Sequence, residues 1–234
     1  MGISQASYTD LKGIRDIWEE RFTTDKEYLE IMFNRIMPFC TSYVYKNEAG
    51  KILSAASFMP MEFIDTSKQK SLEGWYMFGV ATLENASGNR LAAKTILYAI
   101  DKISTKGYHF IFERPANQDL NSYYLKLGFS KPLKRIPFTF KTDSITGSSG
   151  NKQGINKTKY TAQCILEQIE EHFKKRFVWK TPDILEGLIE IGEVEYHNST
   201  LTSNTKEATF IAINPLNGIA PEIFNNAFFC FPME

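Results

Sequence analysis

An apolar strand, a loop of small residues and a helix follow one another in the first half of the chain. The run from Glu73 to Leu83 is apolar enough for a buried strand, and Gly88 lies in the polar loop after it. Apolar residues then recur at helical spacing from about Asn89 to Thr105. The first turn of a helix carries unpaired backbone N–H groups and the positive end of the helix dipole. Such a loop–helix junction is suited to bind a pyrophosphate.

The loop matches neither of two common phosphate-binding motifs. It reads Glu84-Asn85-Ala86-Ser87-Gly88-Asn89-Arg90-Leu91-Ala92. This run contains no GxGxxG, so a Rossmann dinucleotide site is not supported. It contains no GxxxxGK[ST], so a P-loop kinase or ATPase is not supported either. Taken alone, the loop leaves two alternatives open, a phosphate site or an ordinary helix start built from small residues.

Composition argues against several classes of protein. The chain has 27 basic and 27 acidic residues, without the basic excess that is typical of nucleic-acid binding. No apolar run approaches the ~18 residues of a membrane span. The three cysteines form no CxxC pair, which argues against a zinc site, and no export signal precedes them. We therefore expect a cytoplasmic protein with no metal, no nucleic-acid partner and no membrane contact.

Hydrophobic periodicity and turn residues predict the order of the elements. In residues 1–141 the pattern predicts helices at 8–22 and 24–38, strands at 41–46, 51–63 and 73–83, a helix at 89–105, a strand at 108–112, a helix at 119–127 and a strand at 138–141.

A polar stretch rich in Ser, Gly and Asn, residues 142–159, predicts a linker or flexible loop. The alternative is a long excursion between two strands of one domain. Residues 160–234 then predict a small α+β C-terminal domain, with helices at 160–177 and from Thr181, and strands at 191–197, 207–214 and 227–231.

A second motif lies further along the chain. It reads Asn117-Gln118-Asp119-Leu120-Asn121-Ser122-Tyr123-Tyr124-Leu125-Lys126-Leu127-Gly128-Phe129. Asn117, Tyr124 and the pair Gly128-Phe129 resemble a block of the GCN5-related N-acetyltransferases. In that family the central strand also ends in a pattern like V-x-P-x-[RQ]-x-x-G-x-[GA]. Here Ser87 falls at the Arg/Gln position, Arg90 at the first glycine and Ala92 at the Gly/Ala position.

The resemblance covers about residues 1–140 and is especially similar to two-part bacterial members, in which a diverged second domain follows. It implies a mixed α+β fold, a central, mostly antiparallel sheet with helices on both faces. It also implies transfer of an acetyl group from acetyl-CoA to a primary amine of a small molecule or peptide, by direct attack in a ternary complex. The residues expected to hold the coenzyme are Val80, Ala81 and Thr82 for the pantetheine arm, Ser87, Gly88, Asn89, Arg90, Leu91 and Ala92 for the pyrophosphate, and Asn117.

In this resemblance Tyr124 is the general acid that protonates the leaving thiolate. The N–H of Val80 would meet the oxyanion. Asn117 is a helix N-cap, a ligand contact or both. The general base stays open, because Tyr76 and Phe78 stand where many relatives carry a carboxylate. The candidates are Glu73, Glu113 and the C-terminal carboxylate of Glu234.

Two alternatives to catalysis remain at this stage. The missing carboxylate and the departures at Ser87 and Arg90 favour a non-catalytic protein that binds coenzyme A or only a partner protein. Residues 160–234 could also serve as an interaction module that forms a homodimer.

Overall fold

The computed structural model describes residues 2–117, 119–129, 139–141, 157–191, 196–197, 200–202, 212–224 and 227. The elements of the first part are β1 (Gly2–Gln5), α1 (Leu11–Arg21), α2 (Lys26–Ile31), β2 (Thr41–Lys46), β3 (Ile52–Asp65), β4 (Lys70–Thr82), α3 (Leu91–Thr105), β5 (Phe110–Glu113), α4 (Asp119–Lys126) and β6 (Thr139–Lys141). They are followed by α6 (Lys157–His172), β7 (Lys175–Trp179), α7 (Pro182–Glu190), β8 (Tyr196–His197), β9 (Thr200–Thr202) and β10 (Ala212–Pro215).

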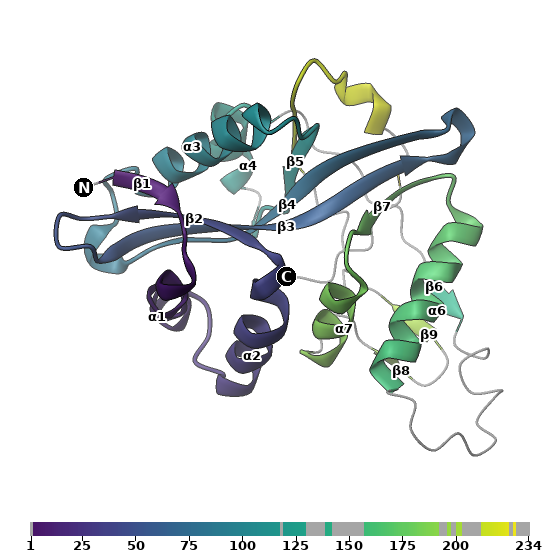
Figure 1. Ribbon diagram of the computed structural model, residues 1–234, viewed down its shortest axis with the longest axis horizontal. Coiled ribbons are helices and arrows are strands. Elements are labelled where there is room, and N and C mark those ends of the chain that lie inside the picture. Colours follow the sequence, from purple (N-terminus) through teal and green to yellow (C-terminus); the bar gives the residue numbers. More distant parts are fainter. Residues whose placement is uncertain are drawn as a thin grey trace.

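Strands β6, β9 and β8 form a small sheet of their own, and the other seven strands form one large sheet. Its strand order is β1-β2-β3-β4-β5-β10, and β7 pairs with the part of β3 that β2 leaves free. All of its described pairs are antiparallel except β4 with β5. Helices α3 and α4 lie on one face, and α1, α2 and α7 lie on the other (Figure 1). The predicted mixed fold, a mostly antiparallel sheet with helices on both faces, is confirmed.

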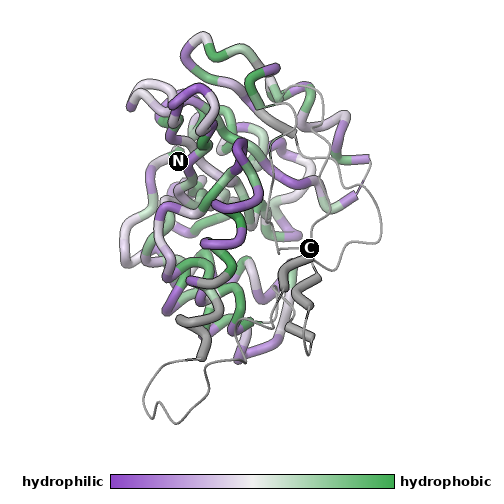
Figure 2. The backbone as a smooth tube through the Cα atoms, turned by 90° about the vertical axis from the view of Figure 1, so that its right-hand side faces the viewer, coloured by the Kyte–Doolittle hydropathy of each residue, from purple (hydrophilic) through white to green (hydrophobic). Residues whose placement is uncertain are grey.

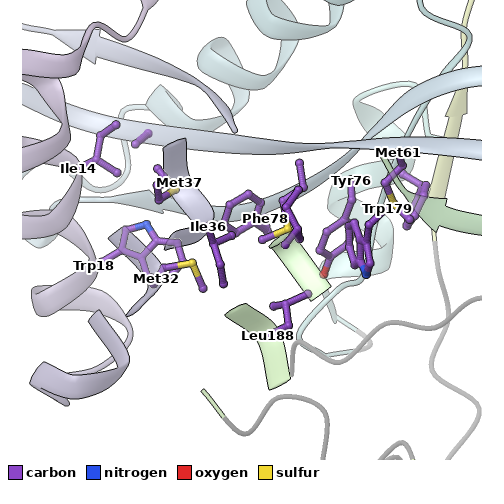
Figure 3. Packing of buried hydrophobic residues seen from close by; sticks show 14 of the residues in the cluster. Ile14, Trp18, Met32, Ile36, Met37, Met61, Tyr76, Phe78, Trp179 and Leu188 are labelled. Atoms are coloured by element: carbon purple, nitrogen blue, oxygen red, sulfur yellow. The ribbon is translucent and has the colours of Figure 1, made fainter. Parts of the chain in front are cut away.

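Two hydrophobic cores form because side chains alternate between the faces of the sheet. On β4, Tyr76 and Phe78 join the core beneath α1, α2 and α7, whereas Trp75 and Met77 join the core beneath α3 and α4. Figure 3 shows Tyr76 and Phe78 beside Trp18 and Trp179 in the first of these cores. Segments of hydrophobic residues run through the middle of the molecule (Figure 2).

A β-bulge at Gly79 interrupts this alternation. Gly79 has φ +58°, and the register with β3 shifts between Ala55 and Ser57, so β4 carries one extra residue there. After the bulge the faces exchange. Ala81 lies in the core of Tyr76, and Val80 packs against the opposite core. The bulge therefore changes the direction of every later side chain on β4.

The helix predicted over 160–177 is wrong at its C-terminal end. Helix α6 ends at His172, and Lys175–Trp179 forms strand β7 on the edge of β3. Phe177 and Trp179, two residues apart, are both buried as strand residues. Residues 142–156 of the predicted linker lie outside the described residues, and 157–159 begin α6. The short helix at Thr181 is confirmed as α7, with Thr181 at the N-cap position and Pro182 after it.

The C-terminal part shares its sheet and its core with the first part. Phe177 packs against Phe63 and Phe110 at ring-centroid distances of 5.1 and 5.2 Å. Phe224 packs against the same two rings at 5.0 and 5.4 Å. Whether residues 1–141 and 160–234 fold as separate domains stays a prediction. Strands β7 and β10 of the second part pair with β3 and β5 of the first part. No helix in the described part of the chain is long and apolar enough to cross a membrane.

Candidate active site

Strands β4 and β5 separate part-way along the sheet. Their parallel pairing runs from Gly74 opposite Phe110 to Met77 opposite Glu113, where β5 ends. Strand β4 continues to Thr82 and stays paired with β3 on its other side. Among the described residues, no strand pairs with β4 beyond Met77 on the β5 side. This edge of β4 therefore offers backbone groups to a bound chain.

A cavity of about 620 Å³ lies at this separation. It is lined by Trp18, Phe22, Thr23, Asp25, Tyr28, Tyr76, Met77, Phe78, Gly79, Val80, Glu113, Arg114, Pro115, Ala116, Leu120 and Tyr124. Tyr76 and Phe78 belong to one core of the sheet, and Tyr124 belongs to the other. The cavity is thus lined from both faces of the sheet, at the point where β4 and β5 part.

Glu113 and Tyr124 form a buried pair in this cavity. Glu113 is only 3% exposed, and burial raises the pKa of its carboxyl to about 9, although a hydrogen bond with Tyr124 opposes part of that rise. Its Oε1 has no hydrogen-bond partner among the described residues. Burial also raises the pKa of the Tyr124 phenol, and the neighbouring Glu113 raises it further. At neutral pH both groups therefore hold their protons.

The second candidate for the general base, Glu73, lies away from this pair. Glu73 does not line the cavity. Its Oε1 lies 2.5 Å from Nζ of Lys180, an ion pair that raises the pKa of Lys180. Glu234 lies outside the described residues. Of the three carboxylates considered from the sequence, the structure brings Glu113 together with Tyr124.

No family model and no curated protein matches the sequence. Similarity is found with solved structures. A GCN5-related N-acetyltransferase from Kribbella flavida superimposes over 97% of this chain and 68% of its own, with a TM-score of 0.56 and 12% identity. A conserved protein of unknown function from Enterococcus faecalis V583, described as a probable N-acyltransferase, matches 60% of this chain with a TM-score of 0.51 and 13% identity. This chain spans 35% of that protein's length. The chain has the GCN5-related N-acetyltransferase fold.

The loop that this fold places before α3 has an unusual backbone at Arg90. Arg90 has φ +57°, in the left-handed region that favours glycine, and it is the residue that precedes α3. The family pattern has glycine at this position, so the backbone agrees with the alignment although the side chain differs. Ser87, Gly88, Asn89 and Arg90 are exposed, Ala92 is half-buried, and Leu91 is buried at the start of the helix.

Side chains of this loop fold back onto its own backbone. The Ser87 hydroxyl donates to the carbonyl of Leu83 at 3.3 Å, and the Asn89 amide donates to the carbonyl of Ala86 at 3.1 Å. The first-turn N–H groups of α3 have no intrahelical acceptor. The loop therefore offers a phosphate group backbone donors and the charge of Arg90, rather than hydroxyl or amide side chains.

The remaining predicted site residues occupy different environments. Val80 lines the cavity, whereas the Ala81 carbonyl already accepts a hydrogen bond from Ser54, and the Thr82 hydroxyl donates to the same Ser54 side chain. Asn117 Oδ1 accepts the N–H of Leu120 at 3.2 Å, a bond typical of a residue at a helix start, and its contact with a ligand stays a prediction.

The sequence alone did not reveal the residues of α1, of the turn after it and of α2 that line the cavity. Trp18 follows from the apolar face of α1, but only as a core residue, and nothing local marks Phe22, Thr23, Asp25 or Tyr28. Their place depends on how α1 and α2 pack across the sheet. Within the described residues, no group of three or more His, Cys, Asp or Glu side chains is arranged to hold a metal ion.

Proposed function

We propose that this chain transfers an acetyl group from acetyl-CoA to a primary amine by direct attack in a ternary complex. The observation that carries the proposal is the cavity, which opens where β4 and β5 part and is lined from both faces around Tyr124. The free edge of β4 suits the pantetheine arm, which lies along it like an added strand. The loop from Ser87 to Ala92 and the start of α3 suit the pyrophosphate.

The proposed chemistry assigns one task to each group. The amine nitrogen bonds to the thioester carbon, and the Val80 N–H stabilises the oxyanion that results. The carbon–sulfur bond then breaks, and Tyr124 gives its proton to the departing thiolate. The nitrogen loses one proton to solvent, so the products are an amide and the free thiol of coenzyme A.

Glu113 serves Tyr124 in this proposal, rather than the amine. Strand alternation places Phe112 in the core of Tyr76 and directs Glu113 to the face of Tyr124. Its protonated carboxyl can return a proton to the Tyr124 phenolate after the thiolate has left. The carboxylate then recovers its proton from solvent, which has received the proton lost by the nitrogen.

Calorimetric titration with acetyl-CoA, followed by a thiol-release assay with a panel of primary amines, tests the proposal. We expect saturable binding and an amine-dependent rise in free thiol. Absence of binding at millimolar acetyl-CoA would refute both acetyl transfer and coenzyme binding.

A non-catalytic coenzyme-binding role is the second candidate. It is favoured by Tyr76 and Phe78, aromatic residues at the positions where many relatives of this fold carry the carboxylate base. Binding of acetyl-CoA without thiol release for any amine of the panel would support this second role.

A further inference from the structure

Aromatic side chains concentrate at the end of the cavity that α1 and α2 cover. Trp18, Phe22 and Tyr28 come from these helices and the residue after α1, and Tyr76 and Phe78 come from β4. The ring of Trp18 packs edge-on against Phe22 at 5.2 Å and against Phe78 at 5.9 Å. Figure 3 shows Trp18, Tyr76 and Phe78 on the same side of the sheet. This end of the cavity is thus bounded by five aromatic rings.

Phe22 differs from its neighbours because it is 51% exposed, whereas Trp18, Tyr76 and Phe78 are buried. An aromatic ring left half in water beside an aromatic-lined cavity gains contact area when an apolar group settles against it.

The charges that line the cavity make a phosphorylated or carboxylated ligand a poor fit at this end. Arg114 is the one cationic side chain among the described lining residues, and it follows β5, not α1 or α2. The charged lining residue on the helical side is Asp25, whose carboxylate accepts the N–H groups of Glu27 and Tyr28 at the start of α2. A protonated amine is compatible with these surroundings, because aromatic faces and a carboxylate both attract cations.

We infer that the acceptor is a primary amine that carries an aromatic or similarly bulky apolar group, with this group held against Phe22, Trp18 and Phe78. The inference rests on the proposed acetyl transfer and adds the class of acceptor to it. The amine would reach the separation of β4 and β5 from this face, opposite Tyr124. Sugars, polyols and phosphorylated amines would place many of their polar groups against aromatic rings, which offer few hydrogen-bond partners.

Thiol release with acetyl-CoA tests the inference through a matched pair of amines, 2-phenylethylamine and ethanolamine, with glucosamine 6-phosphate as a phosphorylated third. We expect kcat/KM for 2-phenylethylamine to exceed that for either other amine by at least about tenfold, since a buried ring contributes roughly that factor or more. Phe22→Ala should lower kcat/KM for 2-phenylethylamine by about tenfold. The loss of kcat/KM for ethanolamine should be smaller, so that the ratio of the two kcat/KM values falls in Phe22→Ala.

Phe39→Ala is the matched control, because Phe39 is 40% exposed and does not line the cavity. Faster turnover of ethanolamine or glucosamine 6-phosphate than of 2-phenylethylamine would overturn the inference while leaving acetyl transfer intact. An equal loss for all three amines in Phe22→Ala would overturn it as well.

Calorimetric titration with 2-phenylethylamine measures the binding of an aromatic amine directly, without any reaction. Binding that weakens in Phe22→Ala and not in Phe39→Ala supports an aromatic-amine site at this end of the cavity, even if acetyl transfer itself fails. Absence of binding in the wild-type protein refutes it.

Discussion

Glu113 is a carboxyl group that the folded protein keeps protonated, because burial raises its pKa to about 9 from an ordinary value near 4.5. The folded state holds this proton more tightly than the unfolded chain does. The stability that Glu113 contributes is therefore complete below about pH 4.5 and is lost as the pH rises toward 9. The glutamine side chain of Glu113→Gln cannot ionise, so this variant should not lose stability in this way as the pH rises.

Urea unfolding at a series of pH values measures the effect. Relative to the wild type, Glu113→Gln should gain on the order of a few kcal/mol in free energy of unfolding between about pH 5 and 9. Glu73→Gln, which removes a half-exposed carboxylate outside the cavity, serves as the control. Parallel pH profiles for the wild type and Glu113→Gln would show that the carboxyl is ionised in the folded protein at neutral pH.

Tyr124→Phe separates the proposed proton donation from packing. The ring contacts Phe129 and Tyr123, and phenylalanine preserves these contacts. We expect kcat to fall by about 10²- to 10⁴-fold, the range typical of losing a general acid, with the affinity for acetyl-CoA nearly unchanged. Stopped-time thiol assays and calorimetry give the two numbers. A collapse of acetyl-CoA affinity would identify Tyr124 as a binding or packing residue instead.

Arg90 occupies a backbone conformation that costs a non-glycine residue about 1 kcal/mol. Arg90→Gly should therefore raise the free energy of unfolding by about that amount. Lys94→Gly, an exposed position in the regular part of α3, should lower it by a similar amount because glycine weakens a helix. Thermal unfolding of the two variants should thus shift in opposite directions, and a loss of stability in both would contradict the account of Arg90.

At the scale of single residues the sequence predicts one half of the cavity better than the other. Tyr124 stands in a block with fixed spacing around α4, so a local pattern is enough to find it. Trp18 and Phe22 reach the cavity only through the packing of α1 across β4, and no local spacing reports a contact of that kind. Glu113 was found as a candidate, but its raised pKa depends on burial that the sequence does not show.

The bulge in β4 depends on close packing between Gly79 and α1. A Cβ atom at Gly79 would lie 2.3 Å from Cζ2 of Trp18, and φ is +58°. Gly79→Ala combines backbone strain with a steric clash and should cost about 2 to 5 kcal/mol of stability. Gly88→Ala has a similar φ of +81° with no atom within 4 Å of the added Cβ, so it should cost only about 1 kcal/mol.

Combining Gly79→Ala with Trp18→Phe tests this packing a second time. Chemical denaturation gives the free energy of unfolding of each single variant and of the double variant. The smaller ring leaves room for the new Cβ, so the double variant should be more stable than the sum of the single losses predicts. Strictly additive losses in the free energy of unfolding would show that the two side chains do not clash.

The elements with strong periodicity could be predicted from the sequence. The error in the helix predicted over 160–177 falls where the pattern changes within a few residues. Helix α6 passes into strand β7 over Phe173 and Lys174, too short a distance for a change of period to be read from the sequence. What makes Lys175–Trp179 a strand is the free edge of β3, more than 100 positions earlier in the chain. A pairing partner that distant is invisible to local propensity.

Because the two parts share one core, the whole chain should unfold as one unit. Phe177 is 1% exposed and packs against Phe63, Phe110, Phe112 and Phe224. Phe177→Ala should cost about 3 to 5 kcal/mol and shift a single calorimetric transition. Leu125→Ala, at a half-exposed position on α4, should change little. Two transitions, of which Phe177→Ala moves only one, would show that the C-terminal part folds independently.

The bulge at Gly79 and the early end of β5 also separate the two halves of the proposed reaction. In the proposed reaction the acyl donor and the amine would reach the cavity from opposite faces of the sheet, and neither would have to leave before the other arrives. No residue needs to carry the acyl group from one to the other. Substitutions in α1 and α2 can then exchange one amine for another while the donor side is untouched, which lets a single scaffold acquire new acceptors by changing half of one cavity.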